Sequence, residues 1–190
     1  MPSVNPAKTA ARDQLLAARR RRPLTELGED ARAIAAQLLA TPEVRRAASV
    51  AAYASIGTEP GTSDLIEALR EAGKRVILPV VLPDRDLAWA AYTGGLHSAR
   101  HGLLEPDGPQ LDPEAVATAD VVLVPGLAVS RTGERLGRGA GCYDRALARV
   151  PVGTPVWILL FDDEVGVEVP TEPHDRPVTG AVSPSGVLRF

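Results

Sequence analysis

Four apolar runs separated by helical segments constrain the fold of this chain more than any other feature. Residues 63–73 and about 140–150 have the apolar spacing of helices, and they lie between runs that are typical of buried strands. Strands that are connected by crossover helices, and are buried on both faces by them, form largely parallel sheets. We therefore predict a three-layer α/β fold, a largely parallel sheet with helices on both faces, which contains strands at 49–55, 75–81, 121–126 and 155–161.

The remaining segments extend the same fold. Helical spacing recurs over 25–40, and the alanine- and arginine-rich residues 5–22 are typical of an exposed helix. We expect an edge strand at 87–92, a loop at 95–114 and a short terminal strand at 178–182. A chain of 190 residues can bury one sizeable core and is short for two, so we predict a single domain over residues 1–190.

Charge and cysteine content exclude several classes of protein. The 21 basic and 24 acidic residues give a formal net charge of −3, so no overall positive field attracts nucleic acid or an anionic membrane. Cys142 is the only cysteine, which excludes an internal disulfide and fits a reducing compartment. The N-terminus lacks an apolar export signal, and no apolar run is long enough to span a membrane. We expect a soluble cytoplasmic protein, a monomer or weak dimer, without nucleic-acid or membrane partners.

Three loops leave the carboxyl ends of predicted strands, where open α/β sheets bind their ligands. The first loop contains Glu59, the second covers 126–141, and the third is an acidic segment that reaches Asp175. We expect all three loops to meet at one edge of the sheet.

The second loop leads into a segment with the composition of a phosphate-binding site. Residues 135–144 read RLGRGAGCYD, with glycines at three alternate positions. This GxGxG spacing matches neither the dinucleotide-binding pattern GxGxxG nor a P-loop. Glycines before a helix still leave amide N–H groups free to bind an anion, and Arg135 and Arg138 add forked donors. The alternative is a glycine-rich turn with surface arginines, and the pattern alone does not decide between the two.

Two further features bear on phosphate binding. Asp144 lies in the first turn of the predicted helix, where its carboxylate either caps the helix or reaches a divalent cation. Lys8 and Arg12 are four residues apart and share a helix face, where two like charges repel each other unless an anion offsets them. The alternative for this pair is a solvated basic face, which the arginines at 19–22 extend as a charged helix end.

The segment RLGRGAGCYD, preceded by VPGLAV at 124–129, resembles the signature of the 5-formyltetrahydrofolate cyclo-ligases, also called 5,10-methenyltetrahydrofolate synthetases. The family pattern reads VPGLAF, a spacer and RLGxGxGYYD. Weaker motifs extend the resemblance over almost the whole chain: the N-terminal lysine and arginine, the strand that leads to Glu59, GKRVILP at 73–79, GLLEP at 102–106 and VPTEPHD at 169–175.

The resemblance implies a fold related to those of sugar isomerases and CoA transferases. It also implies an enzyme that uses ATP and Mg²⁺ to convert a reduced folate, 5-formyltetrahydrofolate, into 5,10-methenyltetrahydrofolate, with release of ADP and phosphate. In the reaction of the family, the formyl oxygen attacks the γ-phosphate, and N10 then closes the ring on the phosphorylated intermediate.

The matched positions imply a role for each residue of the site. Catalytic roles fall to Lys8, Arg12 and Arg135, whose positive charges stabilise the transferring phosphoryl group. The magnesium ligands are Asp144 and Asp175, since Mg²⁺ prefers carboxylate oxygens. The residues implied to bind ATP are Lys8, Arg12, Arg135, Leu136, Gly137, Arg138, Gly139, Ala140 and Gly141, and those implied to contact the folate are Glu59, Cys142 and Tyr143.

The chain departs from the family pattern at three positions. Cys142 replaces the first tyrosine of the YYD motif, and Val129 and Ser130 stand where phenylalanine and aspartate are common. We interpret Cys142 as structural, because the implied reaction needs no cysteine nucleophile. Two other functions stay open: a folate- or nucleotide-binding protein without catalysis, and another ATP-dependent transferase on the same scaffold. The remaining aromatic candidates for contact with the folate, which we expect in the core, are Tyr53, Trp89, Tyr92 and Phe161.

Overall fold

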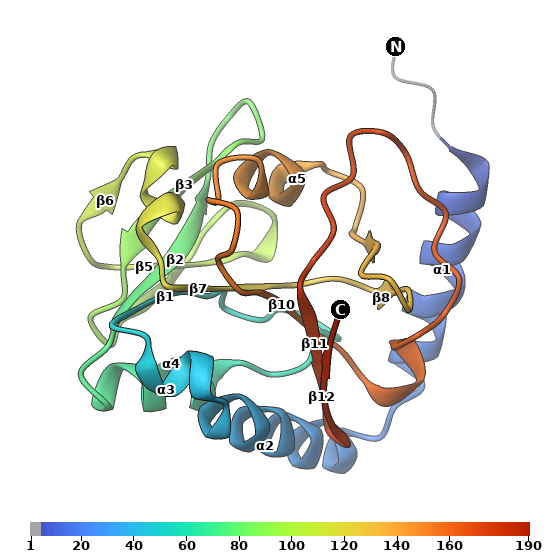
Figure 1. Cartoon of the computed structure of the whole chain (residues 1–190), viewed down its shortest axis with the longest axis horizontal. Helices are drawn as coiled ribbons and strands as arrows, with labels where there is room; N and C mark the ends of the chain where they lie inside the picture. The colour runs from blue at the N-terminus through green and yellow to red at the C-terminus, as the bar shows by residue number, and fades with distance from the viewer. Residues whose placement is uncertain (1–4) are drawn as a thin grey trace.

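An eight-stranded sheet forms the centre of the molecule (Figure 1). The computed structural model describes residues 5–190, and the strands lie in the order β12-β11-β10-β7-β1-β2-β3-β6. The five central strands are parallel: β11 (Gly180–Ser183), β10 (Val156–Leu159), β7 (Val121–Val124), β1 (Ser49–Ala51) and β2 (Arg75–Val81). The outer strands pair antiparallel: β12 (Gly186–Arg189), β3 (Leu87–Ala91) and β6 (Gln110–Leu111).

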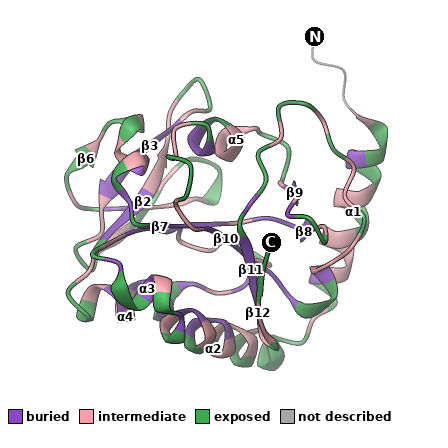
Figure 2. Ribbon diagram, in the orientation of Figure 1, coloured by how far each residue is buried: buried purple, intermediate pink, exposed green. Residues whose placement is uncertain are grey.

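Two separate apolar clusters show that helices cover both faces of this sheet. Along β7, Val121 and Leu123 belong to the cluster on one face, while Val122 and Val124 belong to the cluster on the other, as the alternation of side chains in a strand requires. Figure 2 shows that the central strands are buried. The first face is covered by α2 (Leu24–Ala40), α3 (Pro42–Arg46) and α4 (Ser63–Glu71), and the second by α5 (Cys142–Leu147) and the 3₁₀ helix η2 (Pro113–Thr118). The predicted three-layer α/β fold is confirmed.

The first helix, α1 (Pro6–Arg20), lies beside the sheet rather than on either face (Figure 1). The Asn5 side chain caps it by accepting hydrogen bonds from two backbone N–H groups of its first turn. Its apolar side chains pack against the small hairpin of β8 (Ala128–Val129) and β9 (Arg135–Leu136). This position brings α1 next to the loops at the edge of the sheet.

Two of the sequence expectations for the middle of the chain were wrong. The expected loop at 95–114 contains the hairpin of β4 (Leu96–Ser98) and β5 (Leu104–Pro106), the 3₁₀ turn η1 (Arg100–Gly102) and β6. Because β6 pairs with β3, the strand expected at the edge of the sheet has a neighbour on each side. These strands are two or three residues long and form by pairing with distant segments, so they leave no periodic pattern in the sequence.

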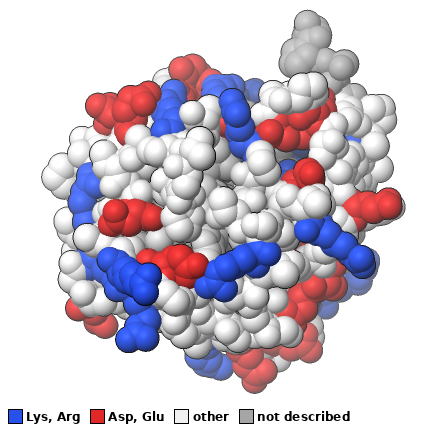
Figure 3. Space-filling view, in the orientation of Figure 1, with Lys and Arg blue, Asp and Glu red and all other residues white. Residues whose placement is uncertain are grey.

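The glycine-rich segment sets the start of α5. Gly141 adopts a left-handed conformation with a φ of 72°, so the helix begins at Cys142 and ends at Leu147, shorter than the 140–150 expected. Among residues 5–190, no helix has both the length and the apolarity needed to cross a membrane. Basic and acidic side chains are interspersed over the face shown in Figure 3, in keeping with the small net charge.

Candidate active site

A cleft of about 1010 Å³ opens at the carboxyl ends of β1, β2 and β7. All three of the loops singled out in the sequence contribute to its lining, and so does α1. Every residue that the sequence predicted for the site lines this cleft, from Lys8 near the N-terminus to Asp175 near the C-terminus. The structure thus brings together segments that lie far apart in the chain.

The glycines at 137, 139 and 141 meet the steric conditions that the sequence suggested. Gly139 has a φ of +104° and Gly141 a φ of +72°, which side chains rarely adopt. A Cβ atom on Gly137 would lie 2.8 Å from Nη1 of Arg135, so a larger residue would push this guanidinium away. Arg12 reaches the same loop, and its Nε donates a hydrogen bond to the Gly137 carbonyl at 2.9 Å.

Arg135 is a buried cation at the centre of these contacts. Its side chain is only 4% exposed, and Nη2 lies 3.2 Å from Oδ1 of Asp144. Nη1 donates to the Pro125 carbonyl at 3.2 Å, and the guanidinium lies 5.8 Å from the centre of the Tyr143 ring. Because these contacts hold the guanidinium in place, it is suited to bind a phosphate oxygen.

Asp144 does not cap α5, which was one of its two possible roles. Its Oδ1 accepts hydrogen bonds from Arg135 and from the backbone N–H of Arg176, at 3.2 Å in each case. The second bond ties Asp144 to the segment that follows Asp175. The two aspartates predicted to hold magnesium therefore lie on adjoining segments at one end of the cleft.

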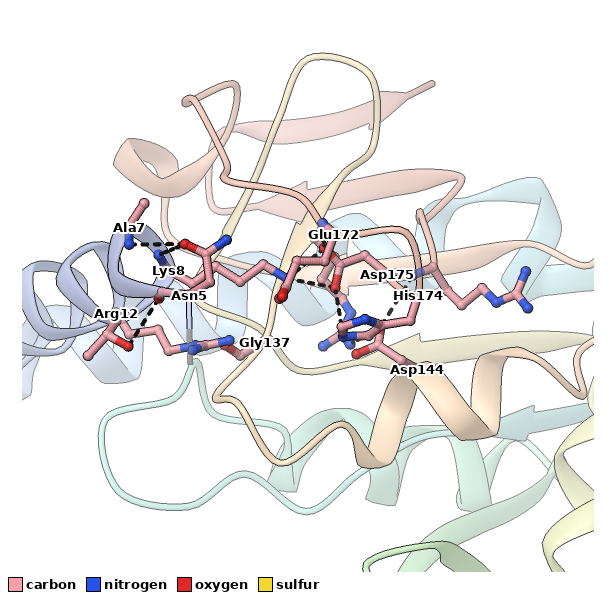
Figure 4. A network of polar contacts seen from close by, with 12 residues as sticks. Asn5, Ala7, Lys8, Arg12, Gly137, Asp144, Glu172, His174 and Asp175 are labelled. Atoms are coloured by element: carbon pink, nitrogen blue, oxygen red, sulfur yellow. Dashed lines mark hydrogen bonds and ion pairs between the residues drawn. The ribbon is translucent and has the colours of Figure 1, made fainter. Parts of the chain in front are cut away.

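Lys8 points from α1 into an acidic cluster (Figure 4). Its Nζ lies 2.8 and 2.7 Å from the two carboxylate oxygens of Asp175 and 2.6 Å from Oε2 of Glu172. Burial alone would lower the pKa of Lys8, but the hydrogen bonds and charges of Asp175 and Glu172 outweigh it and raise this pKa. The sequence had singled out Asp175 but not Glu172, although both lie in the VPTEPHD motif.

Glu59 is a desolvated carboxylate that forms an ion pair with Arg138 of the glycine loop. Its side chain is 7% exposed, and Oε1 lies 3.3 Å from Nη1 of Arg138. Its Oε2 accepts a hydrogen bond from the backbone N–H of Ile56 at 2.9 Å. Burial is the main cause that raises the pKa of Glu59, and the hydrogen bond and the arginine act against it. A carboxylate in this setting is suited to accept hydrogen bonds from ring N–H groups of a ligand.

The aromatic residues divide between the cleft and the core. Tyr143 lines the cleft, and burial raises the pKa of its phenol. Trp89 and Phe161 are buried in the core, as expected, and Tyr92 lies half-buried with its hydroxyl 3.0 Å from Glu67. Tyr53 is buried in an apolar cluster of the core, as expected, and also borders the cleft.

The structure agrees with a structural role for Cys142. Burial raises the pKa of the Cys142 thiol, which opposes formation of the reactive thiolate.

Arg19 is not part of a charged helix end, in contrast to the interpretation from the sequence. Its Nε and Nη2 lie 2.7 and 2.8 Å from the carboxylate of Glu164, and the two side chains are 0% and 2% exposed.

Comparison with known proteins adds to this geometry. The profile of the 5-formyltetrahydrofolate cyclo-ligase family matches residues 4–184 of the sequence. The chain belongs to this family. The cyclo-ligases are ligases, so the chain is an enzyme of that class.

Individual cyclo-ligases are similar over most of the chain. The 5-formyltetrahydrofolate cyclo-ligase of Mycolicibacterium smegmatis is 45% identical over 142 residues, which cover 72% of this chain and 73% of the relative. That of Escherichia coli K12 is 34% identical over 186 residues, 90% of this chain and 98% of the relative. The NMR structure of Aquifex aeolicus 5,10-methenyltetrahydrofolate synthetase aligns with a TM-score of 0.82 at 28% identity, over 96% of this chain and 92% of that one.

Proposed function

We propose that this cyclo-ligase uses ATP and Mg²⁺ to convert 5-formyltetrahydrofolate into 5,10-methenyltetrahydrofolate, with release of ADP and phosphate. The observation that carries the proposal is the single cleft that gathers the cationic side chains of Lys8, Arg12 and Arg135, the glycine loop and the carboxylates of Glu59, Asp144 and Asp175. A protein that only bound folate would need no such set of phosphate- and metal-binding groups.

The phosphates of ATP fit the end of the cleft formed by α1 and the glycine loop. Arg12 and Arg135 both reach this loop, and its exposed residues 138–140 offer backbone N–H groups as further donors. Negative charge spreads over the transferring phosphoryl oxygens in the transition state. Fixed cations that are already in place stabilise this charge without a reorganisation cost.

Asp144 and Asp175 would hold Mg²⁺, and the structure offers a test of that fit. The ammonium of Lys8 is bound between the carboxylates of Asp175 and Glu172, so this cluster already stabilises a cation. Carboxylate oxygens are the protein ligands that Mg²⁺ prefers. When bound, the ion supplies positive charge to the phosphate oxygens.

The folate fits the part of the cleft lined by Glu59, Tyr143 and Cys142. The formyl oxygen attacks the γ-phosphorus of ATP, the bond from that phosphorus to ADP breaks, and ADP leaves. N10 then attacks the formyl carbon and loses its proton, and phosphate leaves with the former formyl oxygen. The chain contributes by holding the formyl group and the phosphate close together in a cleft that limits access of water.

We also propose that one domain carries the whole activity, that the enzyme acts in the cytoplasm and that it is a monomer or weak dimer. A cleft lined by segments from both ends of one chain supports the first point. The half-buried thiol of Cys142 suits a reducing compartment. Light scattering across a concentration series tests the oligomeric state.

The proposed reaction is tested with purified protein, 5-formyltetrahydrofolate, ATP and Mg²⁺. Two signals are followed together: the near-ultraviolet absorbance of the methenyl product and the release of ADP. Both are expected to rise in a one-to-one ratio and to stop when ATP or the metal is omitted. Folate and ATP binding without either signal would show a binding protein instead, and ADP release alone would show a transferase with another acceptor.

A further inference from the structure

The ammonium of Lys8 is fully engaged by the acidic cluster. It has three N–H donors, and three carboxylate oxygens of Asp175 and Glu172 lie 2.6 to 2.8 Å from it. The Lys8 side chain is 5% exposed. The side chain that the family resemblance assigns to a phosphate of ATP is therefore held by carboxylates in this structure.

The same cluster has the donor set of a divalent cation site. One ligand atom from each of Glu172, His174 and Asp175 lies within 4.8 Å of the other two. Figure 4 shows that these side chains and Lys8 converge from α1 and from the 172–175 segment. A carboxylate oxygen bound to Mg²⁺ at about 2.1 Å has little room for an ammonium on the same side. Lys8 and a divalent cation therefore compete for the same oxygens.

We propose that Glu172 is a ligand of the same divalent cation as Asp175, and that the Lys8 ammonium occupies this site until the metal binds. Metal binding then releases Lys8 toward the phosphates of ATP. The second step rests on the proposed function, whereas the competition between Lys8 and the metal does not.

Charge balance makes the two binding events interdependent. A metal that displaced Lys8 without a nucleotide would leave a buried ammonium without a counter-ion, which costs free energy. The phosphates of ATP supply that counter-ion. Metal and nucleotide therefore favour each other's binding, and this coupling is reciprocal.

One substitution at Lys8 is expected to change the affinity for a metal ion and the affinity for ATP in opposite directions. Lys8→Met removes the competing cation and retains most of the side-chain volume. Without nucleotide, Mn²⁺ is expected to bind the variant about 10-fold more tightly than it binds the wild-type protein, within the usual range of coupling between sites. Binding of ATP to the same variant is expected to weaken. A lysine that serves only as a phosphate ligand would leave the affinity for Mn²⁺ unchanged.

Mn²⁺ titrations followed by electron paramagnetic resonance of the free ion provide the test. The matched control is Lys74→Met, because Lys74, the only other lysine, binds the carbonyls of Arg45 and Ala47 away from the cleft. Lys8→Gln is measured alongside Lys8→Met, and thermal unfolding identifies the variants that fold. Equal or weaker binding of Mn²⁺ to the folded Lys8 variants would overturn the competition.

The role of Glu172 is tested in the variant that lacks the lysine. Lys8→Met/Glu172→Gln is expected to bind Mn²⁺ at least about 10-fold more weakly than Lys8→Met, because loss even of a residue that only supports a metal ligand costs about 10- to 100-fold in affinity. Equal affinities would remove Glu172 from the site. These titrations contain no folate and measure no turnover, so a failure of the proposed reaction leaves their result intact.

Discussion

At the scale of single residues, the cleft contains polar groups that reduce the stability of the folded protein. Glu59 is a desolvated carboxylate, and the hydroxyl of Tyr53 is buried without a hydrogen-bond partner among residues 5–190. Each group costs free energy in the folded state unless a ligand satisfies it. Such costs are typical of binding sites, where function and stability place opposite demands on a side chain.

Glu59→Gln is expected to stabilise the protein at pH 7 and to impair the reaction. Because the folded pKa of Glu59 is raised, its contribution to stability is fully present below its unfolded pKa and is lost as the pH rises through the folded pKa. The variant should therefore gain stability over the wild-type protein at pH 7 and little at pH 4, as measured by urea unfolding. The value of kcat/KM for the folate should fall about 10- to 100-fold, as for loss of a charged hydrogen bond. A stability difference that does not depend on pH would contradict the assignment.

Tyr53→Phe is expected to raise the free energy of unfolding by about 1 kcal/mol, because it removes a buried hydroxyl without a partner. Tyr92→Phe is the control, since it removes a hydroxyl that donates to Glu67 at 3.0 Å. That variant should lose stability. If both variants lost the same stability, the Tyr53 hydroxyl would form a hydrogen bond in the folded protein, for example to a buried water.

At the scale of elements, the sequence predicted those segments whose pattern is local. The strands at 75–81 and 121–126 and the helix at 25–40 were recognisable from their own residues, and the structure has them within a few positions. Arg19 was misplaced because its partner, Glu164, lies 145 positions away. Glu172 was missed because nothing in its spacing sets it apart from an ordinary surface carboxylate. Long-range pairs of this kind depend on the completed fold.

Gly139→Ala tests whether the conformation of the glycine loop serves nucleotide binding. Gly139 and Gly153 have φ values of +104° and +94°, so alanine at either position should cost about 1–3 kcal/mol of stability. Only Gly139 approaches the site, where its Cβ would lie 3.3 Å from the Arg12 guanidinium. The KM for ATP should therefore rise in Gly139→Ala and stay unchanged in Gly153→Ala. A similar rise in both variants would mean that general destabilisation, not the loop, affects ATP binding.

Arg19→Met is expected to destabilise the protein by about 3–5 kcal/mol, because it leaves the buried carboxylate of Glu164 without a counter-charge. The control is Arg189→Met, which breaks a more exposed ion pair with Glu43 and should cost about 1 kcal/mol or less. Chemical denaturation measures both. The double variant Arg19→Met/Glu164→Gln should be more stable than Arg19→Met, because it removes the unpaired charge. If the two were equally stable, the charge of Glu164 would not be the cause of the destabilisation.

At the scale of the whole molecule, the two apolar clusters share one sheet, so we expect the chain to unfold as one unit. The two tryptophans report on this directly, since Trp157 lies in the cluster on one face and Trp89 in the cluster on the other. Trp89→Phe and Trp157→Phe each leave one fluorophore. Both variants should show a single unfolding transition at which fluorescence and circular dichroism change together. If the fluorescence of Trp89 and that of Trp157 changed in separate transitions, the chain would consist of two domains that unfold independently.

The contact between Lys8 and Asp175 spans 167 positions of the chain, and this has a consequence for how the enzyme is made. During synthesis α1 leaves the ribosome well before the carboxylates that receive its lysine. The nascent chain therefore exposes its basic first helix before its acidic partners exist. Competence to bind nucleotide should appear abruptly, only once the 172–175 segment has cleared the exit tunnel.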